Sequence, residues 1–130
     1  MKVLLDTQCW LWMQVSPERF APVALELVGS GGNELYLSAA SCWEIAIKFA
    51  LGKLPLPVPP AEYVPGRMET SGVLALPVTV RHALQVAALP LHHRDPFDRL
   101  LIAQAQAEGL HLLTADRQMA AYDVALTWAN

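Results

Sequence analysis

The amino-acid sequence predicts an α/β domain organised around a parallel β-sheet. Short apolar segments alternate along the chain with segments of helical periodicity, which is the pattern of strands joined by crossover helices. Two of the apolar segments are followed by an acid, Asp6 or Asp116, at the strand ends where such sheets bind ligands. The length of 130 residues suits one domain over residues 1–130, and the apolar share of 54% predicts that much of it is buried.

The first part of the chain is predicted to contain two strands and two helices. The apolar run Val3–Leu5 predicts the first strand, and Thr7–Gln14 follows with helical periodicity. We expect the second helix over Pro22–Val28, because proline is tolerated in a first turn, where its missing N–H has no helical partner. A loop containing glycines then leads to Leu35–Ser38, the second predicted strand.

A helix from Ser41 to Gly52 is predicted to be mostly buried. Ser41 and Glu44 have the spacing of a capping box, and Gly52 is suited to end the helix. Glu44 and Lys48 are its only charged residues and lie one turn apart on one face. A buried helix with one polar stripe needs a partner opposite that stripe. Glu44 is therefore a candidate site residue, whereas Lys48 either serves the site or only forms an ion pair.

Prolines interrupt the middle of the chain. The run Leu54–Pro60 predicts an extended connector, and an irregular helix is expected within Ala61–Ser71. The apolar residues Val73–Leu76 predict the third strand. Thr79 then provides an N-cap for a helix that runs to about Leu89.

The last third of the chain contains the clearest helix signals. Asp95, followed by a proline, is suited to the N-cap of a helix, and Gly109 is suited to the left-handed position that ends it. The fourth strand is predicted at Leu110–Leu113. A helical turn at Met119–Tyr122 and a fifth strand at Val124–Trp128 complete the predicted domain.

The acids of the chain have structural explanations as well as functional ones. Asp95 caps a helix, Asp98 complements exposed N–H groups in a first turn, and Asp116 is suited to start a turn. Asp6 is harder to explain in this way, because an acid directly after a buried strand must find partners or leave the core. In a parallel layout, the acids at strand ends and those near helix starts converge at one edge of the sheet: Asp6, Glu44, Asp98 and Asp116.

Such a cluster of carboxylates predicts a metal site. The acids repel one another unless a cation neutralises them, and oxygen ligands without cysteine favour Mg²⁺ or Mn²⁺ over zinc. His92 and His93 lie close in sequence and are expected in a loop or around the ligands. A divalent ion lowers the pKa of a bound water and suits phosphodiester hydrolysis. The flanking arginines either hold substrate phosphates or offset the acidic charge: Arg94, Arg99 and Arg117.

Charge and cysteine content narrow the possible functions. The formal net charge of −3 gives no global attraction to nucleic acid, so such binding needs a local basic patch. Cys9 and Cys42 lack metal-binding spacing and are expected to be free thiols rather than a disulfide. No apolar run is long enough to span a membrane, and the N-terminus lacks a signal-peptide pattern, so we expect a soluble cytoplasmic protein.

Three segments occur in an order and spacing that point to a known family. They are VLLDTQCWLW at the start, SAASCWEIAIKFALGKL in the middle, and HHRDPFDRLLIAQA followed by LLTAD near the end. Together they resemble the PIN-domain nucleases, specifically the VapC-type toxins of bacterial toxin–antitoxin pairs. The resemblance covers essentially the whole chain and implies a three-layer α/β/α fold with a parallel sheet of about five strands.

The resemblance also implies a site and an activity. The family's acidic quartet corresponds to Asp6, Glu44, Asp98 and Asp116, which leaves Asp95 as a helix cap. It implies an endoribonuclease that uses Mg²⁺ or Mn²⁺, hydrolyses RNA through a metal-activated water, and is silenced by a cognate antitoxin. It further implies a homodimer. Some relatives carry another acid after the fourth; Gln118 and Met119 occupy that region here, which weakens the case for a second metal ion.

Two other functions are compatible with the sequence. The same site would serve a nuclease that acts on DNA or on structured RNA. Alternatively, the domain is a non-catalytic or weakly catalytic module whose acids bind a metal and whose surface binds a partner. Trp10, Trp12 and Trp43 are candidates for such a partner groove, although core packing is the commoner fate of tryptophan.

Overall fold

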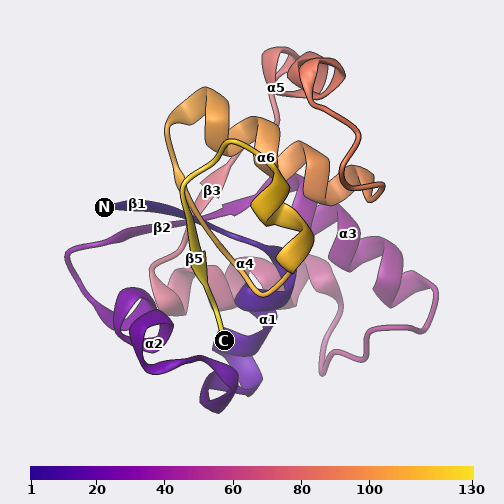
Figure 1. Cartoon of the computed structure of the whole chain (residues 1–130). Helices are drawn as coiled ribbons and strands as arrows, with labels where there is room; N and C mark the ends of the chain where they lie inside the picture. The colour runs from indigo at the N-terminus through magenta and orange to yellow at the C-terminus, as the bar shows by residue number, and fades with distance from the viewer.

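The sheet of the protein, seen in a computed structural model that describes residues 1–130, has five parallel strands in the order β3-β2-β1-β4-β5. Helices cover both of its faces (Figure 1). The strands are β1 (Lys2–Leu5), β2 (Glu34–Ser38), β3 (Leu74–Leu76), β4 (His111–Thr114) and β5 (Leu126–Trp128). The predicted α/β class and all five predicted strands are confirmed, with ends that differ by one or two residues.

The helices follow the predicted order. They are α1 (Thr7–Val15), α2 (Pro22–Gly29), α3 (Ala39–Ala50), α4 (Pro60–Ser71), α5 (Val80–Gln85) and α6 (Pro96–Glu108), with 3-10 turns at Pro17–Arg19, Val86–Ala88 and Arg117–Ala121. Before α6, the Asp95 side chain accepts hydrogen bonds from the backbone N–H groups of Phe97 and Asp98. After it, Gly109 takes a left-handed φ of 65°. Both predicted ends of this helix are therefore confirmed.

Alternate side chains of each strand point to opposite faces of the sheet. In β1, Val3 and Leu5 belong to one buried apolar cluster, whereas Leu4 belongs to another. The first cluster joins the sheet to α1, α2, α3 and α4, and the second joins it to α6. The three-layer α/β/α arrangement is thus confirmed. The central strand β1 ends at the middle of the carboxyl edge, where a ligand site is expected.

The start of α3 differs from the prediction. Ser38 is its N-cap, because the Ser38 hydroxyl oxygen accepts the N–H of Ala40. Ser41 instead lies buried in the first turn, where its hydroxyl oxygen accepts a hydrogen bond of 2.9 Å from the Thr7 hydroxyl. The predicted capping box of Ser41 and Glu44 is therefore wrong. The strand β2 runs directly into the helix, so the cap falls on the last residue of the strand.

The tryptophans and cysteines test two further predictions. Trp10 and Trp12 are 0% and 9% exposed, whereas Trp43 is 63% exposed, so a partner groove formed by all three is excluded. Their burial reflects the apolar packing of α1 against the sheet. Cys9 and Cys42 are free thiols, as predicted.

None of the helices combines the length and the apolar character needed to cross a membrane.

Candidate active site

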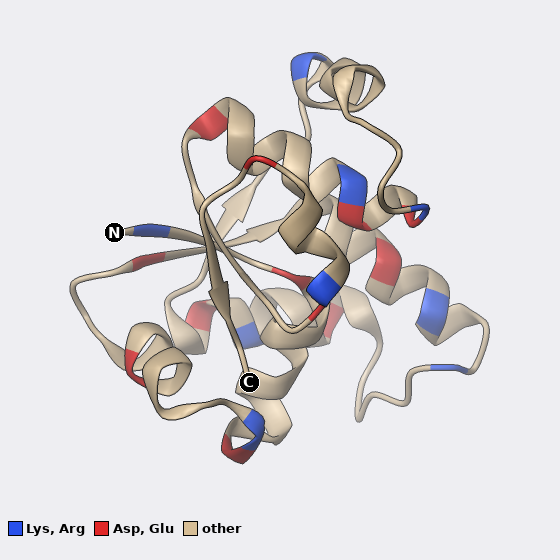
Figure 2. Cartoon of the chain, viewed as in Figure 1, with Lys and Arg blue, Asp and Glu red and all other residues tan.

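The four predicted site acids line one pocket of about 190 Å³ at the carboxyl edge of the sheet. Asp6 follows β1 and Asp116 lies two residues beyond β4, so the parallel pairing of these strands brings both acids to the same edge. Glu44 comes from the second turn of α3 and Asp98 from the first turn of α6. Acidic segments gather in this region in Figure 2, with basic segments of α3 and α6 beside them.

Asp6 is fixed by hydrogen bonds from two different elements. Its Oδ1 accepts the N–H of Cys9 at 2.7 Å, which makes it the N-cap of α1, and its Oδ2 accepts the Thr114 hydroxyl at 2.5 Å. The Thr114 oxygen in turn accepts the N–H of Asp116 at 3.0 Å. Burial raises the pKa of Asp6 above its usual range, while the hydrogen bonds from Thr114 and Cys9 act in the opposite direction. Capping and a role in the site are therefore compatible.

Glu44 and Lys48 form an ion pair across one turn of α3. The Nζ of Lys48 lies 2.8 Å from Oε2 of Glu44, and the two side chains are 50% and 10% exposed. Both residues line the acidic pocket. The ion pair that the sequence left open is confirmed. Because Lys48 reaches from the pocket to solvent, the same pair also places a positive charge at the pocket rim.

The surroundings of Asp98 disfavour its charged form. Burial, followed by the negative charge of Asp95, raises the pKa of Asp98 to about 7. His93 lowers this pKa, and the charges of Asp6 and Asp116 raise it further. Near neutral pH, Asp98 is therefore a mixture of acid and carboxylate when no cation is bound. A cation in the pocket would keep the carboxylates ionised together.

His93 contacts this cluster, which is one of the two positions expected for it, around the predicted ligands. Its Nε2 lies 2.7 Å from Oδ2 of Asp116 and 3.2 Å from Oδ2 of Asp98. Its side chain is 9% exposed. The one feature of the sequence that points to a role for His93 near the acids is its position two residues before Asp95, the N-cap of α6. This position places its ring against the N–H of Asp95.

The donor atoms of the pocket fit a hard divalent cation. Its lining residues include five carboxyl groups, those of the predicted quartet and Asp95, and no thiol. One oxygen each of Asp98 and Asp116 and one ring nitrogen of His93 all lie within 4.8 Å of one another. Oxygen ligands favour Mg²⁺ or Mn²⁺. Such an ion would offset both the repulsion between the acids and the energetic cost of burying the charged Asp6 carboxylate.

The flanking arginines differ in their availability to a substrate. The Arg99 guanidinium donates to four backbone carbonyls and to the hydroxyl of Tyr122; the carbonyls are those of Val86, Leu89, Pro90 and His93. Arg117 donates to the carbonyl of Asn130, and its guanidinium lies 4.1 Å from the ring centroid of Trp128. The structure therefore excludes phosphate binding by Arg99 and leaves it open for Arg94, which is exposed.

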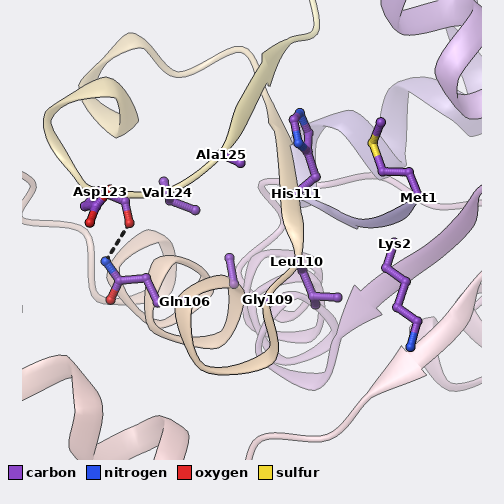
Figure 3. Close-up of a pocket in the computed structure, with 10 residues that line it drawn as sticks. Met1, Lys2, Gln106, Gly109, Leu110, His111, Asp123, Val124 and Ala125 are labelled. Carbon is purple, nitrogen blue, oxygen red and sulfur yellow. Dashed lines mark hydrogen bonds between the residues drawn. The ribbon is translucent and has the colours of Figure 1, made fainter.

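A larger hollow lies at the opposite edge of the sheet. It has a volume of about 400 Å³ and lies at the amino ends of β1 and β4. Figure 3 shows the residues that line it. There Gln106 donates to the backbone carbonyl of Asp123 at 3.0 Å, and Nε2 of His111 pairs with the Thr127 hydroxyl. None of the four predicted acids lines it. The smaller acidic pocket is therefore the candidate active site.

The fold and the acidic edge of the sheet agree with a sequence comparison that identifies the family of this chain. The sequence profile of the PIN domain matches residues 3–125. The chain therefore belongs to the PIN-domain family. Within that family, the curated proteins that it resembles are VapC ribonucleases.

Two of these relatives come from Mycobacterium tuberculosis. The chain is 30% identical to Ribonuclease VapC22 over 118 residues, which cover 90% of this chain and 88% of that protein. It is 57% identical to Ribonuclease VapC16 over 51 residues, which cover 39% of this chain and only 35% of that protein. The solved structure of DNA-bound VapBC from Salmonella typhimurium is similar with a TM-score of 0.73 and 16% identity, covering 100% of this chain and 99% of that chain. This likeness confirms the PIN-like fold.

Proposed function

We propose that the protein is a divalent-metal-dependent endoribonuclease of the VapC type. The convergence of four acids on one pocket of a PIN-domain fold carries this proposal: Asp6, Glu44, Asp98 and Asp116. Similarity to two proteins named ribonuclease VapC supports RNA as the substrate and phosphodiester hydrolysis as the reaction. An enzyme that acts on cellular RNA would work in the cytoplasm.

In the proposed site, Asp6, Asp98 and Asp116 hold Mg²⁺ or Mn²⁺, directly or through waters. Glu44 completes the surrounding oxygen shell, and Lys48 orients it through their ion pair. The bound ion would supply a water of lowered pKa and a positive charge for the scissile phosphate. Since Asp6 already has fixed hydrogen-bond partners on two elements, its carboxylate needs little reorganisation when the ion binds.

Removal of divalent ions is expected to abolish cleavage. Purified protein should cut single-stranded RNA in Mg²⁺ or Mn²⁺, leave it intact in excess EDTA, and cut it again when the metal is restored, because the activated water depends on the ion. Gel electrophoresis of a labelled RNA and of a DNA of the same sequence measures both the metal dependence and the substrate. Undiminished cutting in EDTA would overturn the metal dependence, and cutting of the DNA alone would overturn RNA as the substrate.

We further propose that the protein is the toxin of a toxin–antitoxin pair and forms a homodimer. Its similarity to VapC proteins and to the VapC-containing VapBC structure supports a small antitoxin as the partner. The surface also offers room for protein contacts. An apolar hollow of about 660 Å³ lies between α3, α4 and β3, where Leu74 is 47% exposed. Exposed apolar surface of this kind is typical of sites that bind another chain.

A further inference from the structure

We propose that His93 is a positioning residue of the metal site, which holds the carboxylates of Asp98 and Asp116 in place without binding the ion. This inference rests on the proposed function, because it presumes that these acids bind a divalent cation. It concerns a residue outside the four predicted acids. The contacts of both ring nitrogens carry it, together with the burial of the side chain.

The local contacts of the His93 ring select its tautomer. Its Nδ1 accepts the backbone N–H of Asp95 at 3.1 Å, so the Nδ1 lone pair is occupied. A neutral imidazole carries a single N–H, which must then be on Nε2. That N–H faces Oδ2 of Asp116 at 2.7 Å and Oδ2 of Asp98 at 3.2 Å. One donor therefore bridges Asp116, two residues beyond β4, and Asp98 in the first turn of α6.

The surrounding structure holds the backbone that carries this ring. The backbone N–H of His93 donates to the Tyr122 hydroxyl at 2.8 Å, and its carbonyl accepts from Arg99 at 3.4 Å. Arg99 also donates to the same Tyr122 hydroxyl at 3.2 Å. The backbone of His93, the arginine and the tyrosine thus form one hydrogen-bonded unit, from which the ring reaches the acids. A donor held in this way fixes the separation of the two carboxylates before any ion binds.

Direct metal binding by His93 would break this arrangement. If Nε2 bound the ion, the ring proton would have to move to Nδ1, where it would face the N–H of Asp95. Two donors would then point at each other at the N-terminus of α6. Donation from Nε2 to the carboxylates keeps every contact and leaves their other oxygens for the ion. Hydrogen bonds to ligating carboxylates of this kind commonly change metal affinity by ~10–100-fold.

Two conservative substitutions test the contacts of Nδ1 and of Nε2 separately. His93→Asn keeps an acceptor near the position of Nδ1 but cannot reach the carboxylates, whereas His93→Gln places an amide N–H near the position of Nε2. We expect His93→Asn to weaken Mn²⁺ binding by ~10–100-fold. We expect His93→Gln to bind Mn²⁺ almost as tightly as the unchanged protein. Isothermal titration of the whole chain with Mn²⁺ measures these affinities, and circular dichroism checks that each variant is folded.

His92→Ala is the matched control, because His92 is exposed and its ring packs edge-on against Tyr122 without contacting the acids. Equal Mn²⁺ affinity of His93→Asn and the unchanged protein would contradict the positioning role of His93 but not the proposed metal site. No Mn²⁺ binding by the unchanged protein would overturn the proposed metal site as well. Electron spin-echo spectra of the Mn²⁺-loaded protein provide a second readout. We expect no directly bound imidazole nitrogen, and such a nitrogen, lost in His93→Gln, would show that His93 is a ligand.

Discussion

Replacement of Asp6 by asparagine is expected to lower the rate of metal-dependent RNA cleavage by at least ~100-fold while the fold is retained. The substitution removes one negative charge from the proposed metal site, and each loss of ~1.4 kcal/mol in transition-state stabilisation slows a reaction about tenfold. The fold is retained because the new amide oxygen still accepts the N–H of Cys9, and its nitrogen donates to the Thr114 hydroxyl oxygen. The lost rate would therefore report on charge rather than on unfolding.

Initial rates on a labelled single-stranded RNA in Mn²⁺ measure this effect, and thermal unfolding of Asp6→Asn checks its fold. Asp123→Asn is the matched control, since Asp123 lies at the hollow on the opposite edge of the sheet (Figure 3). It should cleave RNA as fast as the unchanged protein. A folded Asp6→Asn variant with undiminished activity would exclude Asp6 from the site.

The metal-free protein is expected to lose stability as Asp98 ionises. The pKa of Asp98 is raised from 3.8 to about 7 in the folded protein. Between these values the unfolded chain has released a proton that the folded chain still holds, so the free energy of unfolding falls as pH rises. The contribution of Asp98 is fully present below about pH 4 and is lost as pH rises through about 7. Each pKa unit corresponds to ~1.4 kcal/mol.

Asp98→Asn is expected to remove the part of this pH dependence that Asp98 contributes and to stabilise the metal-free protein near pH 8 by up to about 4 kcal/mol relative to the unchanged chain. Urea unfolding in EDTA at several pH values measures the difference, and Asp123→Asn should keep the original slope. In Mn²⁺ the unchanged protein should instead be the more stable of the two, because the proposed site binds the ion through the carboxylate form of Asp98, which the variant lacks. Parallel pH profiles of Asp98→Asn and the unchanged protein in EDTA would contradict a raised pKa at Asp98.

Much of the fold was predictable because local chemistry decides it. The ends of α6 follow from Asp95, which accepts two backbone N–H groups, and from Gly109, which adopts a positive φ. The meeting of Asp6 and Asp116 followed from the direction of the strands, since parallel strands place their carboxyl ends at one edge. The alternation of apolar segments and helices was enough to predict the sheet.

Other features depend on contacts between segments that are distant in the sequence. His93 meets Asp116 across 23 residues, and most acceptors of Arg99 are backbone carbonyls, which carry no sequence signal. The sequence alone therefore could not show that Arg99 stabilises the structure through hydrogen bonds rather than binding a phosphate. The start of α3 was misplaced because Ser38 and Ser41 both suit an N-cap, and only the length of β2 decides between them.

The chemical ends of the cleaved RNA test most directly whether the acidic pocket hydrolyses RNA with a water nucleophile. Cleavage of single-stranded RNA in Mn²⁺ and ¹⁸O-labelled water, followed by mass spectrometry, identifies these ends. If water attacks the phosphate as proposed, the products are linear terminal phosphates that contain ¹⁸O from the first turnover, and Asp6→Asn yields none of them. Products that end in 2′,3′-cyclic phosphate would show that the RNA 2′-hydroxyl attacks instead, and would contradict metal-assisted hydrolysis at this pocket.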